Sequence, residues 1–252
     1  MSNRISEEFL QKKEPVRLNK YLSEAGVCSR READRLIESG RVTVDGERAR
    51  TGMRIVPGQV VKVGHKVVSK QDEMVVLAVN KPRGIVCTEE RRERNSIVRF
   101  LDYPVRVTYI GRLDKDSHGL LLMTNNGDII NRMMRAANRH EKEYKVTVDH
   151  EITPEFLEKM ASGVPILDTV TRPCEVKQSG KYTFSIILTQ GLNRQIRRMC
   201  SALGYEVRDL LRVRVMNIRL DGLKDGQYRK LTDEELEGLY ELIKDSPGEP
   251  GR

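Results

Sequence analysis

The order of strand-like and helix-like segments after residue 74 restricts the fold of this 252-residue chain more than any other feature. Apolar or alternating patterns predict strands at 75–79, 106–110, 119–124, 143–149, 183–189 and 213–220. Helical spacing of apolar residues predicts helices at 127–137, 154–162, 194–203 and 233–243. Because strands and helices do not alternate regularly, a doubly wound parallel sheet is disfavoured and an α+β domain is predicted.

A smaller unit is predicted ahead of that domain. Apolar residues at helical spacing, closed by a glycine, predict its first helix (Leu18, Tyr21, Leu22, Ala25, Gly26). Ser29 and Glu32 form a capping-box pattern that begins a second helix, which Gly40 ends. A strand at 42–44 then leads into the Asp45-Gly46 turn of a hairpin. We therefore divide the chain into a disordered lead (1–14), a small domain (15–72), a larger domain (73–245) and a tail (246–252).

The charge balance indicates a polyanionic partner. The net charge is +8, and residues 1–72 hold 15 Lys and Arg against 10 Asp and Glu, a net +5. Phosphate backbones favour such cations through counterion release, so nucleic acid is the expected partner. On the second helix Arg31 and Arg35 share a face, with Arg30 and Arg41 close by. The alternative is an ordinary solvated basic face.

Several classes of protein are excluded by what the sequence lacks. No apolar run approaches the roughly 20 residues of a membrane helix, and residues 1–8 have no apolar core of a signal peptide. A cytoplasmic protein is therefore expected. The four cysteines are widely scattered and form no C-x-x-C pair, so neither a metal site nor a disulfide framework is predicted.

Three polar motifs suggest chemistry in the larger domain. The segment 111–121 holds Arg112 and Asp114 in a polar turn that runs into an apolar strand, which places a carboxylate at the rim of a sheet. The segment 191–199 supplies guanidinium groups that could pair with it, and Asn80-Lys81-Pro82-Arg83-Gly84 precedes both. Alternation alone leaves Asp116 as a rival for the reactive carboxylate.

Taken in chain order, as a first motif at 80–84, a second at 111–121 and a third at 191–199, the three resemble the motifs of the RsuA/RluB/RluE/RluF family of bacterial rRNA pseudouridine synthases. The run from Arg17 to Ala33 resembles the S4 RNA-binding module, which contacts structured RNA by shape and phosphate. The resemblance covers residues from about 74 to 243 and most of what precedes them. It implies a mixed, mainly antiparallel sheet flanked by helices, and isomerisation of uridine to pseudouridine without a cofactor.

The resemblance also implies roles for individual residues. Asp114 would be the essential ionised carboxylate, acting on the sugar, on the base or on the C2′ proton, and Arg197 would be its partner. Tyr144 would stack on uracil, although a strand tyrosine is more often part of a core. Arg112 would fill the space left by the flipped base, with a salt bridge to a neighbouring carboxylate as the alternative. The remaining cations expected to contact RNA are Arg17, Lys20, Arg30, Arg31, Arg35, Arg41 and Arg194.

Within the family, the stretches at 114–117 and 135–144 look most like the RluF-type branch. That similarity implies 23S rRNA as the substrate, with a tRNA as a second one, and nothing demands more than a monomer. Three alternatives remain open. They are a small-subunit (16S) rRNA synthase, an RNA-binding protein without turnover, and a glycosylase that releases free uracil.

Overall fold

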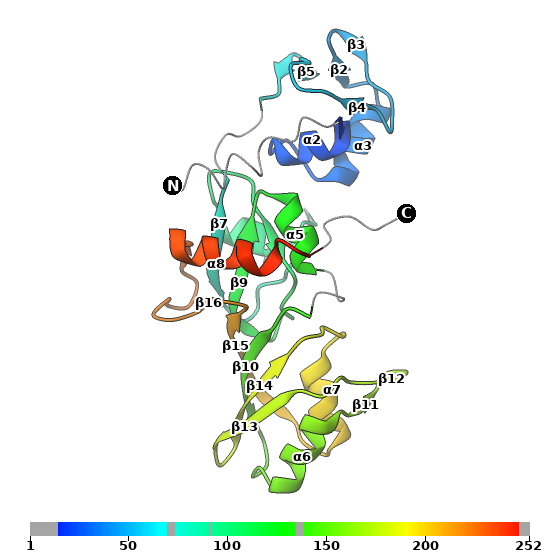
Figure 1. Cartoon of the computed structure of the whole chain (residues 1–252). Helices are drawn as coiled ribbons and strands as arrows, with labels where there is room; N and C mark the ends of the chain where they lie inside the picture. Colours follow the sequence, from blue (N-terminus) through cyan, green and yellow to red (C-terminus); the bar gives the residue numbers. More distant parts are fainter. Residues whose placement is uncertain (1–14, 70–73, 91, 135–138, 247–252) are drawn as a thin grey trace. The chain divides into compact units, whose positions relative to one another are not determined.

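The computed structural model describes residues 15–69, 74–90, 92–134 and 139–246, and the chain divides into two compact units (Figure 1). The first unit is the N-terminal segment up to Val75 together with the short segments 103–107 and 125–127; the second is the remainder. The predicted lead at 1–14 and, apart from Ser246, the predicted tail at 246–252 lie outside the described residues. The predicted domain boundary at 72/73 also falls there and stays a prediction.

The N-terminal segment folds into two helices beside short strands. Its elements are β1 (Val16–Arg17), α2 (Leu18–Glu24), α3 (Arg30–Glu38), β2 (Val42–Val44), β3 (Glu47–Arg48), β4 (Arg54–Ile55), β5 (Val61–Val63) and β6 (Lys66–Val67). The strands β3-β2-β5-β6 form one antiparallel sheet, and β1 pairs with β4. The turn predicted at Asp45-Gly46 joins β2 to β3, and both residues have the positive φ that such a turn requires.

The core of this unit includes Leu18 and Leu22, two of the apolar positions predicted for the first helix, and Tyr21 packs against it partly buried. Leu18 and Leu22 of α2 are buried against Ala33 and Ile37 of α3 and against the inward side of β2. The Ser29 hydroxyl accepts a hydrogen bond from the Glu32 amide at 3.3 Å, which caps α3. The other half of the predicted capping box is replaced, because the Glu32 carboxylate lies 3.5 Å from the Arg35 guanidinium.

The second unit is built on one sheet of nine strands. Its strands are β7 (Val76–Lys81), β8 (Thr108–Ile110), β9 (His118–Thr124), β10 (Lys142–Val148), β13 (Glu175–Gly180), β14 (Thr183–Leu188), β15 (Val207–Val215), β16 (Ile218–Arg219) and β17 (Tyr228–Lys230). The order is β13-β14-β10-β15-β9-β7-β17, with β16 on β15 and β8 on β9. Only the β15–β9 pairing is parallel among the described strands, which confirms the mixed, mainly antiparallel sheet.

Five helices and a small hairpin accompany the sheet in the described part of this unit (Figure 1). They are α4 (Ile97–Leu101), α5 (Gly127–Met134), α6 (Pro154–Ser162), α7 (Gln195–Ala202) and α8 (Asp233–Ile243), with the hairpin strands β11 (Pro165–Ile166) and β12 (Thr169–Val170). The helices α6 and α8 have the predicted bounds, because each begins at a threonine that caps it: Thr153 and Thr232. The capping box at Thr232 and Glu235 is complete. No helix in the described ranges is long and apolar enough to span a bilayer.

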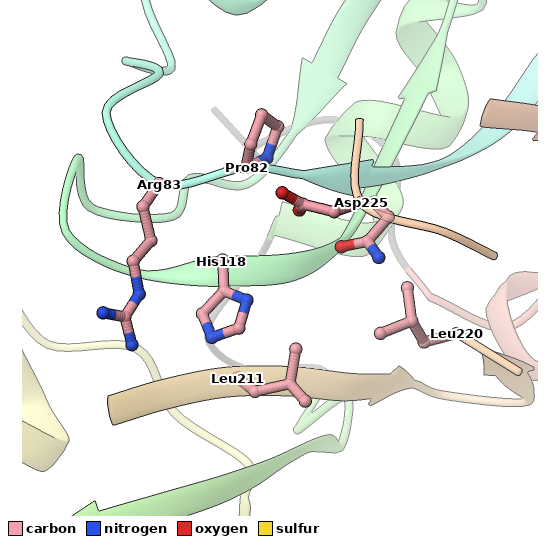
Figure 2. Close-up of a pocket in the computed structure, with 7 residues that line it drawn as sticks. Pro82, Arg83, His118, Leu211, Leu220 and Asp225 are labelled. Carbon is pink, nitrogen blue, oxygen red and sulfur yellow. The ribbon is translucent and has the colours of Figure 1, made fainter. Parts of the chain in front are cut away.

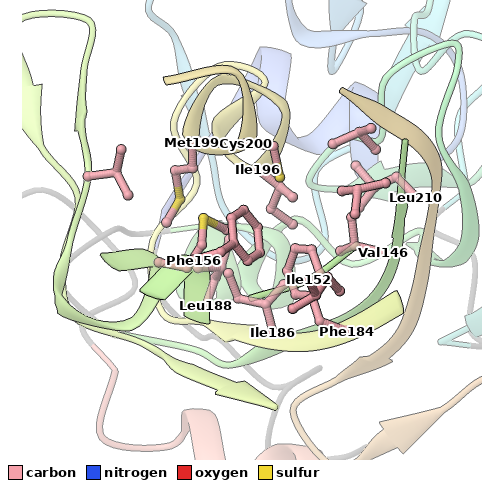
Figure 3. Packing of buried hydrophobic residues seen from close by; sticks show 14 of the residues in the cluster. Val146, Ile152, Phe156, Phe184, Ile186, Leu188, Ile196, Met199, Cys200 and Leu210 are labelled. Atoms are coloured by element: carbon pink, nitrogen blue, oxygen red, sulfur yellow. The ribbon is translucent and has the colours of Figure 1, made fainter. Parts of the chain in front are cut away.

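The main core near the site lies between the sheet and helices α6 and α7. Figure 3 shows Ile196, Met199 and Cys200 of α7 together with Phe156 of α6 and Leu188 of β14. All five are buried, and Tyr144 of β10 packs against the same cluster. The apolar side of α7 therefore fixes the helix on the sheet and leaves its arginines outside this core.

Some predicted elements were wrong. The strand predicted at 213–220 begins earlier, at Val207, and is interrupted by a turn at Met216 and Asn217 before β16. Met216 has a φ of 52°, a left-handed conformation that cannot be predicted from a methionine in the sequence. The short helix α4 and the strands β13 and β17 were not predicted. Helix α5 is described to Met134, and the rest of its predicted span lies outside the described residues.

Candidate active site

The segment 111–117 forms a loop between β8 and β9, and its own hydrogen bonds shape it. The amide of Ser117 donates to the carbonyl of Asp114 at 3.1 Å, which closes a tight turn. The amide of Leu113, a buried residue, donates to the Cys87 sulfur at 3.5 Å. The turn therefore presents the side chains of Asp114 and Asp116 from a backbone fixed on both sides.

The first motif, at 80–84, contacts this loop and holds it in place. The amide of Gly84 donates to the Lys115 carbonyl at 2.7 Å, which joins the first motif to the loop directly. Lys81 is completely buried, and its ammonium donates to the carbonyls of Pro82 (2.9 Å) and Ile85 (2.8 Å). Burial lowers the pKa of Lys81. These contacts hold the backbone of the first motif in the shape that supports the loop.

Asp116 is the more heavily bound of the two loop carboxylates. Its two oxygens accept from the two terminal nitrogens of Arg194 at 3.1 and 3.0 Å, a bidentate pair. The Arg197 Nε lies 3.4 Å from the same carboxylate. The hydrogen bond from Arg194 holds the pKa of Asp116 below its usual range. Asp116 is therefore a fixed anion that orders the two arginines.

Asp114 has a looser environment. Its carboxylate is about a third exposed (34%), and the one ion pair found for it in the described ranges is with Arg194, at 3.6 Å. The predicted partner was Arg197, and the structure does not form that pair. Arg197 donates instead to the Asp116 carbonyl (3.2 Å), the Ser117 hydroxyl (3.4 Å) and the Val207 carbonyl (3.3 Å). The physical reason is that Arg197 lies one helical turn further from the N-terminus of α7 than Arg194 and reaches the end of the loop.

The N-terminus of α7 is folded tightly around its arginines. Arg194 is the N-cap residue and has a φ of 50°, in the left-handed region. Gln195 is buried and its side-chain oxygen accepts from the Leu192 amide at 3.1 Å. Arg198 donates to the Asn193 carbonyl at 3.0 Å and to the Asn193 side-chain oxygen at 3.2 Å. The third motif therefore fixes its own loop while presenting Arg194 to both carboxylates.

Tyr144 and Arg112 occupy positions compatible with their predicted roles. Tyr144 is half-buried on β10, opposite Ile186 and Arg212 on the neighbouring strands. It contributes to the core, as the structural alternative proposed, and the residue is only partly buried. Arg112 is exposed, and it forms no hydrogen bond or ion pair within residues 15–69, 74–90, 92–134 and 139–246. The predicted alternative of a salt bridge is therefore not seen there.

A second cluster that the sequence analysis missed lies beside the loop. His118 follows Ser117 on β9, and its Nε2 is 2.7 Å from the Asp209 carboxylate, which also binds Arg83 of the first motif. Figure 2 shows Arg83 and His118 at a cavity of about 490 Å³, with Leu211 and Leu220 as apolar walls. Asp209 sits on a strand in a charged stretch and has no motif of its own. The only signal in the sequence was a histidine, His118, directly before the strand predicted at 119–124.

A further cavity borders the arginines of α7. It has a volume of about 470 Å³ and lies between α7 and the β11–β12 hairpin, lined by Arg194, Arg197, Arg198 and by Ile166 and Leu167. Three guanidinium groups around one cavity make it a site of positive potential, suited to a phosphodiester. Because Arg194 also contacts the loop carboxylates, this cavity adjoins the loop and could hold a phosphate next to it.

The predicted RNA-contacting cations of the N-terminal unit differ in their exposure. Five arginines are exposed: Arg17, Arg30, Arg31, Arg35 and Arg41. Lys20 is half-buried, and its ammonium lies 3.6 Å from the Glu24 carboxylate. Lys20 is thus less available for phosphate than its neighbours, whereas the arginines leave a basic surface on α3.

Comparisons with known proteins give consistent results. A family model for RNA pseudouridylate synthase matches residues 75–202, and an S4 domain model matches residues 16–61. Over 236 residues the chain is 54% identical to the dual-specificity RNA pseudouridine synthase RluF of Escherichia coli (strain K12), covering 93% of this chain and 81% of the relative. It is 36% identical, over 90% of this chain and 96% of the relative, to ribosomal large subunit pseudouridine synthase B of Bacillus subtilis (strain 168). A crystal structure of a pseudouridylate synthase aligns with a TM-score of 0.66 at 29% identity, covering 89% of this chain and 99% of the other.

Proposed function

The chain belongs to the RNA pseudouridylate synthase family and isomerises uridine to pseudouridine in RNA, and we propose that its substrate is a defined uridine of 23S rRNA, with a tRNA as a second substrate. The family resemblance noted in the three motifs is thereby confirmed, as is the N-terminal S4 domain. The observation that carries the proposal is the 54% identity with RluF, whose name describes dual specificity. The large-subunit relative of Bacillus subtilis supports the same choice over 16S rRNA.

The reaction has three chemical parts. The N1–C1′ bond breaks with its electron pair on uracil, the base rotates, and C5 bonds to C1′ while the C5 proton leaves and N1 regains one. Bonds and protons balance within the nucleotide, so no cofactor is required. We propose that the enzyme acts as a cytoplasmic monomer.

We propose Asp114 as the essential carboxylate, because the geometry separates it from its rival. Both oxygens of Asp116 are engaged by Arg194, whereas Asp114, although the less exposed of the two, keeps only a single, longer contact. A group that must reach a sugar or a base needs an available oxygen. Attack on the sugar, attack on the base and removal of the C2′ proton all require the ionised form of a carboxylate.

The other predicted residues receive roles that follow from their contacts. We propose that Arg197 is a positioning residue, which holds the end of the loop through the Asp116 carbonyl and the Ser117 hydroxyl. Arg112 is exposed at the loop and can enter the space of an extruded base, where its planar group replaces the lost stacking. Tyr144 is a partly buried aromatic residue, and we propose that the base stacks on its ring.

The test is tritium release from RNA labelled at C5 of uridine, which reports the loss of the C5 proton. Full-length 23S rRNA, 16S rRNA and bulk tRNA are offered separately to the wild type and to Asp114→Asn and Asp116→Asn. We expect release from 23S rRNA and from tRNA, none with Asp114→Asn, and reduced release with Asp116→Asn. Release from 16S rRNA alone would contradict the substrate proposal, and retained activity in Asp114→Asn would contradict the choice of carboxylate.

The same experiment excludes the two remaining alternatives. A glycosylase would release free uracil and leave an abasic site, which is detected as strand cleavage by aniline. A pure binding protein would retain affinity for the RNA and release no tritium with any of the three substrates. A pure binding protein gives no reason for a carboxylate loop beside Arg194 and Arg197, because a carboxylate repels phosphate.

A further inference from the structure

Arg212 is a buried arginine that the proposed mechanism does not use. It lies on β15, only 2% of its surface is exposed, and its Nε donates to the Leu120 carbonyl at 2.7 Å. Across the described ranges it forms no ion pair, and its Nη2 is buried without a hydrogen-bond partner. An uncompensated buried charge and an unsatisfied buried donor both oppose folding. Such a group calls for an explanation.

Its position in the sheet is the first part of that explanation. Register places four residues of adjacent strands in one row: Lys81 of β7 opposite Gly119 of β9, then Arg212 of β15, then Tyr144 of β10. Partners across neighbouring strands project to the same side of a sheet, so Arg212 lies beside Tyr144. Tyr144 packs on the core under α7, which is the side where the loop meets its arginines. The Arg212 guanidinium therefore lies on the side of the sheet that carries α7 and the candidate active site.

The sheet is shaped locally to accept this arrangement. At Gly119 the φ is 104°, and a Cβ there would overlap with the carbonyl oxygen of Arg212. No side chain fits at that point, so β9 approaches the backbone of β15 closely. In the row, Gly119 stands between two buried cations, Lys81 and Arg212.

The electrostatic surroundings are the second part. Burial lowers the pKa of Lys81, the charge of Arg212 lowers it further, and Asp114 and Asp116 act in the opposite direction. The pKa of Lys142, also buried, falls to about 8, again first through burial and then through Arg212. Arg212 and the two loop carboxylates therefore act on the same ammonium group, that of Lys81.

We propose that Arg212 is a positioning residue of the active centre, which supports Tyr144 from the adjacent strand and maintains a fixed positive potential beneath the base. The inference rests on the proposed function. When the N1–C1′ bond breaks, the electron pair stays on uracil, so negative charge develops above this row of cations. A cation that is already in place, and dry, stabilises that charge without reorganisation. The unpaired state of the guanidinium is then a property that the reaction uses.

Three substitutions separate charge from packing. Arg212→Met removes the charge at similar volume, Arg212→Gln keeps a donor for the Leu120 carbonyl, and Arg212→Lys keeps the charge. The matched control is Arg214→Met, two positions along the same strand, where the guanidinium is paired with Glu143 at 2.8 Å and Glu141 at 3.0 Å. Single-turnover tritium release, the Kd for 23S rRNA and the melting temperature are measured for each protein.

We expect Arg212→Met and Arg212→Gln to lower the single-turnover rate about 100-fold, with the Kd for RNA within about twofold of the wild type. Arg212→Lys should recover at least about tenfold of that loss. The melting temperature of Arg212→Met should be unchanged or higher, since an unpaired buried charge is replaced by an apolar group. Arg214→Met should keep its rate and lose stability, because two carboxylates lose their partner.

The outcomes are distinguishable. A wild-type rate in Arg212→Gln would overturn the role of Arg212 and leave the proposed function intact. A loss of rate that is equal in all three Arg212 variants and parallels their melting temperatures would also overturn it, since that is the result of a structural role. If Arg212→Met does not fold, the comparison of Arg212→Gln with Arg212→Lys decides the same question. Absence of release by the wild type from every RNA would overturn the proposed function and this role together.

Discussion

Replacing Asp116 by asparagine should weaken the loop without abolishing the reaction. The substitution keeps one acceptor oxygen and removes the charge that binds Arg194 at 3.1 and 3.0 Å and Arg197 at 3.4 Å. A charge-assisted hydrogen bond contributes about 1.5–3 kcal/mol when it is buried. Here Asp116 and Arg194 are 49% and 42% exposed, so screening by solvent reduces the contribution of the pair to about 1 kcal/mol.

That loss converts into two measurable quantities. In a chain of this size, about 1 kcal/mol corresponds to a fall in the melting temperature of about 2–4 °C. If the same free energy is lost in positioning Asp114, two residues away, single-turnover tritium release should slow about fivefold. Asp114→Asn should instead lose activity by orders of magnitude at an unchanged melting temperature.

The stability difference should depend on pH in one direction. Arg194 holds the pKa of Asp116 below its ordinary value, so the carboxylate stabilises the fold above its unfolded pKa of about 3.9. The stabilisation is lost as the pH falls through the lowered native pKa. The gap in melting temperature between wild type and Asp116→Asn should therefore be full at pH 6 and shrink below about pH 4. A gap that does not change with pH would refute the ionic origin, and an Asp116→Asn protein as inactive as Asp114→Asn would move the essential role to Asp116.

Three further predictions concern a strand contact, a helix cap and the basic surface of the N-terminal unit. Gly119→Ala should lower the free energy of unfolding, measured by urea denaturation, by more than about 3 kcal/mol, because the φ of 104° and the overlap with the Arg212 backbone act together. The control Gly58→Ala, at a φ of 95° in open space, should cost only about 1–2 kcal/mol. Equal effects would mean that the close approach of the strands is unimportant. Thr232→Ala should lower stability by about 1 kcal/mol because the capping box is removed, and Thr232→Ser should restore it, so a destabilised serine variant would argue against the cap. Neutralising the exposed arginines of α3 (Arg30, Arg31, Arg35) should make the slope of log K for RNA binding against log salt concentration shallower by about 0.7–0.9 for each lost phosphate contact. The rate on saturating RNA should not change. An unaltered slope would show that α3 is not a docking surface.

Local signals in the sequence predicted the parts of the fold that depend on neighbouring residues. The starts of α6 and α8 follow from Thr153 and Thr232, whose hydroxyls cap backbone amides three residues later. The buried stripes of α2 and α3 follow from helical spacing alone. In each case the residues that decide the structure lie within one or two turns of one another.

Features that depend on distant residues were not predictable in the same way. Met216 adopts a φ of 52° because β15 and β16 turn there, and a methionine carries no signal for that conformation. The choice of Arg194 for Asp114, and of Arg197 for the loop end, depends on how α7 is seated on the sheet. The family motif supplied the residues of the site but not these pairings. Asp209 lay outside every motif, and only the fold brings it to Arg83 and His118.

The left-handed backbone at Arg194 has a consequence for the evolution and engineering of this enzyme. An L-residue with a φ of 50° is disfavoured by about 1–2 kcal/mol, and glycine or asparagine would relieve most of it. A search for thermostable variants would therefore select against arginine at this position, although its guanidinium reaches both loop carboxylates. Thermal stability and catalytic activity therefore favour different residues at position 194. Mutant libraries aimed at more stable variants should keep Arg194 unchanged and vary other positions.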